Sequence, residues 1–479
     1  MKHFLTRTTI PAFAISTALA LLPIHTVNAQ ETTSGITHND SKEEEYKTKI
    51  IEKEYDKWRK LLTYDQYMMF NMYHLLHLNN LIKEANGKID IIKSGELDER
   101  KMIRTIDELL MKKKIDKDIH VYKYLTAEEV GFKHSELIEI SAYDTKINRH
   151  SFKDLSENFK YGISVGYLDP YLTKKEEKFN GPILLDLKLL KGTHIGYLDT
   201  NGHIILPRNQ GIIITNLSII VENGKEKIKV EAELVDKDTI TTKIETKENT
   251  INKHFRAAIE NGTSSHRENE LPVETKLIKI VPNNLNASFA VNKAAILLHL
   301  LTQSIPGDLL IKTIEQMNPK GALTITDIPW GKLDNVIDQD FKKISDHTFA
   351  LYDIDKKQIV LNLGTHKQLL YSLQTIGEDD PAPETPVQSL IHEFGHAVDM
   401  LILNELSTTS EFKDIYTEEK DNIKIENYMK KNPQEFFASA FSYLFSPNTY
   451  YQERIKKEAP KTVTFIQNAL KKTGLYKIR

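Results

Sequence analysis

The run His392-Glu393-Phe394-Gly395-His396 determines how the second half of this chain is interpreted. A helix is predicted over Ser389 to Asn404, because apolar residues recur on one stripe of it. These residues are Ile391, Phe394, Val398 and Leu401. The two histidines are four residues apart, so their rings project from the same side of the helix. Two imidazoles placed in this way can bind one Zn²⁺ and leave room for a third ligand and a water.

Glu393 directly follows the first histidine. It is expected to reach the water rather than the metal, as a general base does. The alternative is a pair of structural histidines that meet on one helix face by chance. The helical context and the secretion signal described below favour the metal site. The pattern is therefore typical of a zinc-dependent endopeptidase.

A third protein ligand is needed, and Glu435 is the best candidate. It lies at the start of a helix predicted over Gln434 to Leu444. A second interpretation gives it a structural role: Asn432 would be the N-cap, Pro433 the first helical residue and Glu435 a capping glutamate. From spacing alone, both roles stay open.

The composition narrows the chemistry. The chain of 479 residues contains no cysteine, which excludes a cysteine protease, a thiol redox enzyme and a Cys-type zinc finger. Any zinc must then be held by histidines and carboxylates. The 64 basic and 67 acidic residues are well mixed and leave a net charge of -3. This balance argues against a nucleic-acid partner or a basic membrane-binding surface.

Residues 1–29 are typical of a secretory signal peptide. Lys2 and Arg7 give a positive start, Pro11 to Ile24 is apolar, and Val27-Asn28-Ala29 offers a cleavage site. The alternative is an uncleaved anchor, but the apolar stretch is short for a spanning helix. We therefore expect a secreted, extracellular protein without stable membrane insertion. Residues 30–45 are polar and charged, and are expected to form a flexible N-terminus.

The remaining pattern predicts an α+β fold with two domains, over residues 46–250 and 251–479. Helical periodicity dominates from Tyr46 to about Lys114. Strand signals follow, at Ile119–Leu125, Ile183–Leu190, Ile212–Val221 and Lys227–Val235. A charged, sparsely apolar stretch near Asn249 is the expected domain boundary, and helices return after it.

Several segments resemble the anthrax lethal factor family, from about Tyr46 to the C-terminus. The strongest are the run from His392 to Asp399 and Glu435-Phe436-Phe437-Ala438, with Tyr428 shortly before it. Weaker similarities are Asn158–Tyr161, Gly196–Leu198, Asp327–Ile328 and Ala459–Thr462. The resemblance implies a mostly helical zincin-type metallopeptidase domain over residues 251–479.

By position, the resemblance implies that His392, His396 and Glu435 hold Zn²⁺. It assigns Glu393 as the catalytic base and Tyr428 as a residue that assists catalysis. The implied activity is toxin-like cleavage of peptide bonds in protein or peptide substrates, including host proteins. The alternative within this enzyme class is an extracellular peptidase that acts on surface or matrix proteins.

The first half resembles the ADP-ribosyltransferase-like domain of the same family. The positions that match the active residues of ADP-ribosylating toxins are altered here to Lys123, Ser164-Val165-Gly166 and His203. We interpret residues 46–250 as a degenerate, non-catalytic module for docking a substrate or partner. An active ADP-ribosyltransferase toxin is the less favoured alternative, because the catalytic glutamate is replaced.

Two departures from the family pattern matter. Members of this family begin with a domain that docks onto a separate translocating pore protein. No such domain is expected between the signal peptide and Tyr46, so this translocation partner is in doubt. In addition, Ser439 stands where the family has a glutamate that supports the zinc ligands, so that support is expected to differ.

Overall fold

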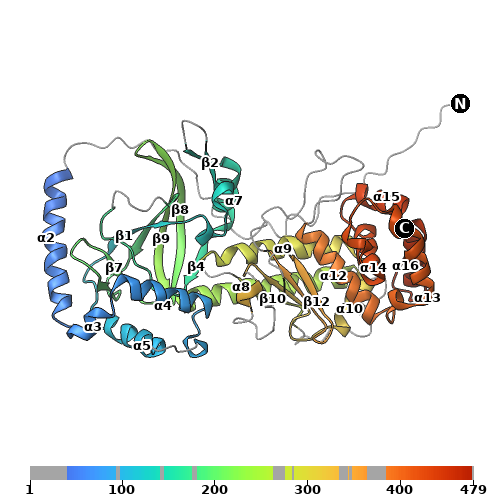
Figure 1. Cartoon of the computed structure of the whole chain (residues 1–479), viewed down its shortest axis with the longest axis horizontal. Coiled ribbons are helices and arrows are strands. Elements are labelled where there is room, and N and C mark those ends of the chain that lie inside the picture. Colours follow the sequence, from blue (N-terminus) through green and yellow to red (C-terminus); the bar gives the residue numbers. More distant parts are fainter. Residues whose placement is uncertain are drawn as a thin grey trace.

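The computed structural model describes residues 40–92, 98–140, 145–174, 181–262, 276–282, 285–328, 330–333, 344, 348–363 and 385–476. Two lobes lie side by side in Figure 1, the first built around a five-stranded sheet and the second around a four-stranded sheet. The signal peptide predicted over residues 1–29 lies outside the described residues. Within them, no single helix is long and apolar enough to cross a membrane. Only the sharply bent pair Ala287–Ser304 and Gly307–Gln316 meets those conditions when joined.

The first lobe begins with a series of helices. They are α2 (Asp40–Arg59), α3 (Tyr64–Met68), α4 (Met72–Glu84), η1 (Ile89–Ile91) and α5 (Glu99–Leu110). Residues 40–45 were expected to be flexible, but they form the start of α2. Residues 30–39 lie outside the described residues.

Five strands form the sheet of the first lobe in the order β1-β5-β9-β8-β4. They are β1 (Ile119–Leu125), β5 (Ile183–Leu189), β9 (Lys225–Asp236), β8 (Gln210–Glu222) and β4 (Tyr161–Ser164). All neighbours are antiparallel except β5 and β9. Asn223 and Gly224, both with positive φ, turn β8 into β9, as a tight hairpin requires. The strands predicted at residues 119–125, 183–190, 212–221 and 227–235 are thus confirmed.

Shorter elements complete the first lobe around this sheet. They are η2 (Glu128–Val130), α6 (His134–Leu137), β2 (Ile138–Ile140), β3 (Thr145–Ile147), α7 (Arg149–Asn158), β6 (Gly196–Tyr197) and β7 (Ile204–Ile205). One core holds helices and sheet together, with Trp58, Leu78, Ile103, Leu187 and Val230 all nearly inaccessible to solvent. Burial of such side chains is the main stabilising contribution to a domain of this kind.

Helix α8 (Lys237–Asn261) runs through the position where a domain boundary was expected near residue 250. Its buried Ile240 packs in a cluster with strand residues of the first lobe. Its buried Phe255 and Ile259 belong to the core of the second lobe. The charged residues that suggested a linker, such as Lys243 and Glu245, are instead exposed on the outer side of a continuous helix.

The second lobe has a sheet in the order β10-β11-β13-β12. Strands β10 (Ile278–Val281), β11 (Leu323–Thr326) and β13 (Gln358–Asn362) are parallel, and β12 (Ala350–Asp353) is antiparallel at the edge. Its helices are α9 (Ala287–Ser304), α10 (Gly307–Gln316), α11 (Trp330–Leu333), α12 (Pro386–Leu401), α13 (Ser410–Glu419), α14 (Pro433–Leu444), α15 (Thr449–Glu458) and α16 (Pro460–Lys472). Figure 1 shows α13 to α16 gathered at the far end of this lobe. The α+β class is therefore confirmed for both lobes.

Buried polar contacts join the two lobes at the start of α9. The Ser288 hydroxyl accepts a hydrogen bond from the Lys160 amide at 2.8 Å and donates to the Asn158 carbonyl at 2.5 Å. The Lys293 ammonium pairs with Asp154 at 3.0 Å. These contacts, together with α8, connect the first lobe to the helix layer of the second.

Candidate active site

Helix α12 presents the two histidines. The Thr385 side chain caps it by accepting a hydrogen bond from the Gln388 amide at 3.2 Å, and Pro386 occupies the first turn, where its missing N–H costs nothing. The helix ends at Leu401, three residues before the predicted end. Ile391, Phe394 and Val398 are completely buried. The apolar stripe therefore faces the core and leaves the histidines on the other side.

Helix α14 presents Glu435. The Asn432 side chain accepts a hydrogen bond from the Glu435 amide at 2.8 Å, and Pro433 is the first helical residue. The predicted N-cap therefore exists, but it uses the backbone of Glu435 rather than its side chain. The carboxylate is left to point toward α12. The two interpretations of Glu435 do not exclude each other.

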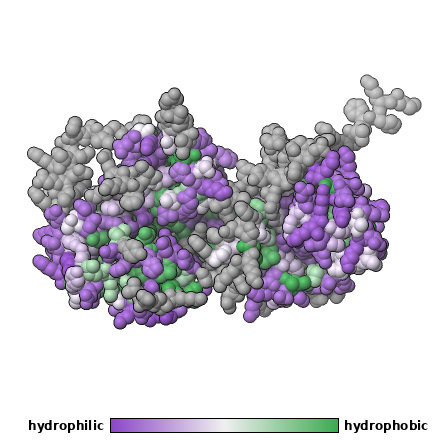
Figure 2. Space-filling view, in the orientation of Figure 1, coloured by the Kyte–Doolittle hydropathy of each residue, from purple (hydrophilic) through white to green (hydrophobic). Residues whose placement is uncertain are grey.

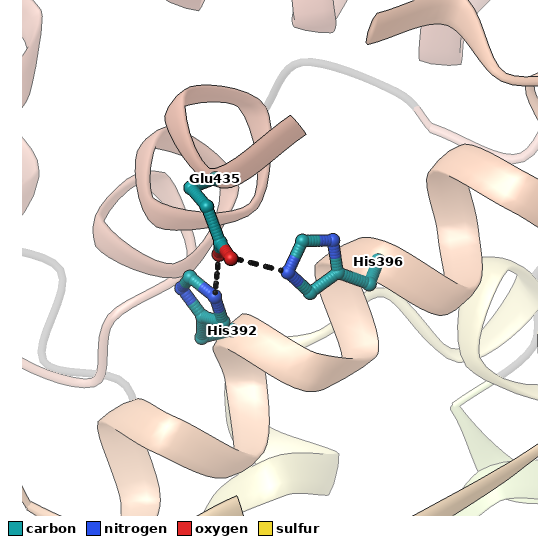
Figure 3. Close-up of side chains that lie close together, drawn as sticks. All are labelled: His392, His396 and Glu435. Atoms are coloured by element: carbon teal, nitrogen blue, oxygen red, sulfur yellow. Dashed lines mark hydrogen bonds and ion pairs between the residues drawn. The ribbon is translucent and has the colours of Figure 1, made fainter. Parts of the chain in front are cut away.

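The side chains of His392, His396 and Glu435 converge (Figure 3). Nε2 of His392 lies 3.1 Å from Oε2 of Glu435, and Nε2 of His396 lies 3.2 Å from the same oxygen. The three donor atoms are within 4.8 Å of one another. The side chains are 12% to 20% exposed, so the group is sheltered but reachable. Two imidazole nitrogens and one carboxylate oxygen form a donor set that fits Zn²⁺.

A close approach of α12 and α14 makes this convergence geometrically feasible. A Cβ atom on Gly395 would lie 3.1 Å from the Phe441 ring and 3.2 Å from the backbone of Ala438. Because no side chain stands at residue 395, the helices can pack with backbone near backbone. This is the structural reason for glycine between the two histidines, and the sequence alone did not reveal it.

Burial and pairing have opposite effects on the charges of this cluster. Burial on its own would raise the pKa of Glu435, but hydrogen bonds with His392 and His396 bring the pKa well below its usual value. For His392 burial acts in the other direction and would lower the pKa, because it too disfavours the charged form. The hydrogen bond with Glu435 and the nearby carboxylates nevertheless raise the pKa of His392. A carboxylate that stays ionised beside two imidazoles is suited to binding a cation.

Glu393 turns toward the edge of the second sheet. Its Oε2 accepts a hydrogen bond from the backbone amide of Tyr352 in β12, at 2.7 Å. The proposed base is thereby held between α12 and the edge strand. The contact could not be inferred from the sequence, since it depends on how β12 packs against α12.

Tyr428 lies in the short helix η6 (Tyr428–Lys430), just before α14. Its hydroxyl donates to Oε1 of Glu435 at 2.8 Å, and the Lys431 ammonium donates to that hydroxyl at 3.2 Å. The ring is 49% exposed, so the hydroxyl borders both the cluster and solvent. Burial and the neighbouring Glu435 raise the pKa of Tyr428. The group therefore stays a proton donor at neutral pH.

Sequence reasoning missed Glu426 entirely. This residue precedes η6, is partly buried and lies close to the Ser439 and Tyr443 side chains. Burial raises its pKa, while the charge of His392 lowers it. The one available signal was its position two residues before Tyr428, which does not distinguish it from other loop carboxylates.

In the first lobe, Lys123 and His203 belong to a different kind of cluster, which is centred on Asp169. The Lys123 ammonium donates to Asp169 at 2.6 Å. Nε2 of His203 lies 3.0 Å from the Asp169 carbonyl oxygen, and its ring stacks on Tyr171 at 4.3 Å. Burial opposes charge on Asp169, but His203 and Lys123 lower its pKa to about 2. Ser164 donates to the backbone of Gly166 at 3.1 Å. The polar groups of this cluster thus form hydrogen bonds and ion pairs with one another.

A cavity of about 630 Å³ lies beside this cluster. Its lining includes Lys123, Asp169 and the run from Ser164 to Gly166, together with Phe289 and Ile328 from the second lobe. Figure 2 shows hydrophobic residues reaching the surface of the first lobe near α4, where Met72 and Leu76 are exposed. The lining thus combines apolar side chains with the ion pair of Lys123 and Asp169.

Two family models match the chain. Residues 268–469 match the anthrax toxin lethal factor N- and C-terminal domain, and residues 47–237 match the ADP-ribosyltransferase exoenzyme. These ranges cover most of the two lobes, and the unmatched interval between them contains all of α8 except its first residue.

Individual relatives agree with these matches. The chain is 30% identical to lethal factor of Bacillus anthracis over 411 residues, which is 82% of this chain and 48% of lethal factor. It is 36% identical to a Pro-Pro endopeptidase of Clostridioides difficile over 81 residues, covering 17% of this chain and 36% of that protein. The chain thus spans about half or less of the length of these curated relatives.

Among solved structures, C3larvin toxin, an ADP-ribosyltransferase from Paenibacillus larvae, is similar to part of this chain. Its identity is 28%, it covers 38% of this chain and 92% of its own, and the TM-score is 0.33. Because lethal factor aligns with 82% of this chain at 30% identity and residues 268–469 match the lethal factor model, the chain belongs to the anthrax lethal factor family, and its C-terminal domain is of the zinc metalloendopeptidase type.

Proposed function

We propose that this protein is a secreted, toxin-like zinc endopeptidase that cleaves peptide bonds in protein substrates. In this proposal His392, His396 and Glu435 hold the metal, and Glu393 and Tyr428 are the catalytic side chains. The observation that carries it is the convergence of three donor atoms from two helices within 4.8 Å. The signal peptide predicted at residues 1–29 supports secretion.

When bound, zinc would supply Lewis-acid chemistry, lowering the pKa of a water molecule and polarising a carbonyl group. Glu393 would accept the proton from the attacking water and deliver it to the leaving amine. Its hydrogen bond with the Tyr352 amide supports this role, because it fixes the carboxylate between α12 and β12. An oriented base loses little entropy on reaching the reactive geometry.

Tyr428 would donate a hydrogen bond to the oxygen that becomes negative in the transition state. Its hydroxyl already borders the cluster, and its raised pKa keeps the proton in place at neutral pH. In the structure the hydroxyl donates to Glu435. A donor that changes partners as charge develops would stabilise the transition state more than the bound substrate.

The substrate would bind as an extended segment along β12. This strand is the last one in the order of its sheet, and its Tyr352 amide contacts the proposed base. Backbone groups at a sheet edge can pair with an added peptide strand. Such binding would bring a peptide bond past Glu393.

A second candidate is an extracellular peptidase that acts on surface or matrix proteins. The match to a Pro-Pro endopeptidase favours it, since its 36% identity exceeds the 30% identity to lethal factor, although over far fewer residues. In this version the bond cleaved would lie next to proline. The two candidates share one chemistry and differ in substrate.

Mapping of newly formed protein N-termini tests the proposal. Purified protein and a Glu393→Gln control would each be added to host-cell lysate and, separately, to bacterial surface proteins. We expect new N-termini only with the unsubstituted protein, and the sample that yields them identifies the substrate class. Identical N-termini in both preparations, or none in any sample, would refute the endopeptidase.

A further inference from the structure

The cavity beside Lys123 and Asp169 is bounded by both lobes. Helix α4 and the run from Ser164 to Gly166 line it from the first lobe, and Phe289 and Ile328 line it from the second. Its volume of about 630 Å³ lies within the range of small-molecule sites, which is roughly 300–1,000 Å³. One side chain of a docking protein would leave much of this space empty. The size therefore favours a free ligand over an anchoring residue.

Hydrogen bonds hold the walls of the cavity in place. On α4, the Asn79 side chain accepts from the Tyr167 amide at 2.7 Å and donates to the Tyr167 carbonyl at 2.9 Å. A Cβ atom on Gly166 would lie 2.7 Å from Oδ1 of Asn79, so this glycine permits the close approach of α4. From the second lobe, the buried Asn286 donates to the Val130 carbonyl at 3.2 Å. The space is thus preformed, as is usual for a ligand site.

The charges around the cavity do not suit an anionic ligand. Among the described lining residues are three lysines and four carboxylates, an excess of one negative charge, and no arginine. Lys123 lies 2.6 Å from Asp169 and Lys83 lies 3.9 Å from Glu129. The third lysine, Lys133, is exposed to solvent. Phosphate groups in proteins are typically bound by cations that are free to pair with them. A phosphate inside this cavity would instead have to compete with carboxylates for the lysines.

Apolar side chains make up most of the remaining lining. Leu125, Leu185 and Ile205, from three strands of the first lobe, are almost completely buried. Met72 and Leu76 of α4 are 45% and 63% exposed, so the apolar lining continues from the interior to the surface. Water beside such side chains finds few hydrogen-bond partners. Its displacement by an apolar group is therefore favourable.

We propose that this cavity is a binding site for a small, uncharged and mainly apolar molecule. The ligand would contact α4 of the first lobe together with Phe289 and Ile328 of the second. Because both lobes supply the walls, a bound ligand would stabilise their packing against each other. The inference goes beyond the proposed peptidase activity and does not depend on zinc binding by the second lobe. A nucleotide site and unspecific adsorption to exposed apolar residues are the competing explanations.

The test titrates full-length protein with Nile red, an uncharged apolar dye whose fluorescence rises when it leaves water. We expect saturable binding of one dye per chain and a higher melting temperature in its presence. Leu76→Glu should weaken dye binding about 10-fold, because it places an unpaired charge beside the ligand. Leu285→Trp should weaken it as well, since this half-buried lining residue would then fill part of the space.

Leu61→Glu is the matched control for Leu76→Glu. Leu61 is 47% exposed in the same lobe and is absent from the lining, so its substitution should leave dye affinity unchanged. Equal weakening by Leu61→Glu and Leu76→Glu would indicate unspecific adsorption and overturn the inference. Failure of the unsubstituted protein to bind the dye at saturation would overturn it as well.

Competition with NAD and with ADP-ribose tests the nucleotide explanation. Neither should displace the dye, because each carries a pyrophosphate group for which the cavity offers no free cation. Displacement by either compound would overturn the inference. His396→Ala, which removes a proposed zinc donor, should bind Nile red with unchanged affinity. A peptidase proposal that fails would therefore leave the dye result intact, and the two outcomes can be told apart.

Discussion

The molecule contains two clusters of titratable side chains that differ in what they leave available. In the second lobe, His392, His396 and Glu435 direct three donor atoms toward one another from two helices. In the first lobe, the Lys123 ammonium lies 2.6 Å from Oδ1 of Asp169, and Nε2 of His203 lies 3.6 Å from Oδ2. The first arrangement concentrates donors of electron pairs, whereas the second neutralises an acid with a base.

This difference shows why a perturbed pKa is not by itself a sign of catalysis. Asp169 and Glu435 both have lowered pKa values, because each carboxylate is held by basic partners. The partners of Glu435 are imidazoles, which can exchange a proton for a metal ion. Asp169 is held by one imidazole, that of His203, and by the Lys123 ammonium, which has no lone pair to offer when charged. The chemistry of the partner, rather than the size of the shift, separates the two sites.

The largest expected effect is loss of the metal. His396→Ala removes one of three donors, so we expect stoichiometric zinc in the unsubstituted protein and little zinc in the variant, with peptidase activity abolished. Elemental analysis after gel filtration measures the zinc content of the two proteins. A matched control is His254→Ala, which changes an exposed histidine of α8 and should retain zinc. Full zinc content at normal affinity in His396→Ala would remove the distinction drawn between the two clusters.

The second largest effect is expected from removing the proposed catalytic base, Glu393. Glu393→Gln keeps the shape of the side chain and should retain zinc and fold, but lower kcat by about 10²–10⁴-fold. Glu411→Gln, on an exposed part of α13, serves as the control and should be fully active. Steady-state kinetics on one cleavable peptide decide the matter. Near-normal turnover by Glu393→Gln would contradict the mechanism.

Tyr428→Phe should lower kcat by about 10²–10³-fold with little change in KM or zinc content, since one transition-state donor is removed. The control is Tyr416→Phe, because the Tyr416 hydroxyl donates to the Lys430 carbonyl at 2.6 Å and holds the same loop. That variant should melt at a lower temperature with kcat nearly intact. If both variants behave alike, Tyr428 holds the loop rather than taking part in the reaction.

In the first lobe a smaller effect is expected, and on stability alone. The lowered pKa of Asp169, about 2, means that its contribution is complete above the ordinary aspartate pKa near ~4 and is lost as pH falls toward 2. Asp169→Asn should cost about 1–3 kcal/mol at pH 6, leave peptidase activity unchanged and abolish this part of the acid sensitivity. Urea unfolding at pH 6 and pH 3 measures it. Loss of peptidase activity in the folded variant would mean that the first cluster serves the reaction after all.

For the first lobe we expect no ADP-ribosyltransferase activity at all. Because Lys123 and His203 are engaged with Asp169, we expect no transfer of labelled ADP-ribose from NAD to any lysate protein. An active ADP-ribosyltransferase exoenzyme is the positive control. Label transfer that disappears in a Lys123→Ala variant would show that the first cluster is catalytic.

The parts of this structure that the sequence predicted are those set by local periodicity. Strand β1 was placed at Ile119–Leu125, and both histidines were placed on one helix face, because each depends on residues a few positions apart. The contact of Glu393 with Tyr352 and the position of Glu426 depend on packing between distant segments, for which the pattern carries no signal. Helix α8, which runs through the expected boundary near residue 250, was missed for a related reason. An exposed helix face and a linker have the same polar composition.

Helix α8 has a consequence for how the molecule loses its structure. Ile240 of α8 packs in one hydrophobic cluster and Phe255 of the same helix packs in another. Unfolding of either lobe should therefore disrupt the packing of α8 against the other lobe. The two halves should therefore melt in a single calorimetric transition, and an ion bound near α12 would protect amides in β8 and β9 against hydrogen exchange. A cut at residue 250 would divide this shared helix and expose both clusters. The first lobe would thus form part of the folding unit on which the second lobe depends.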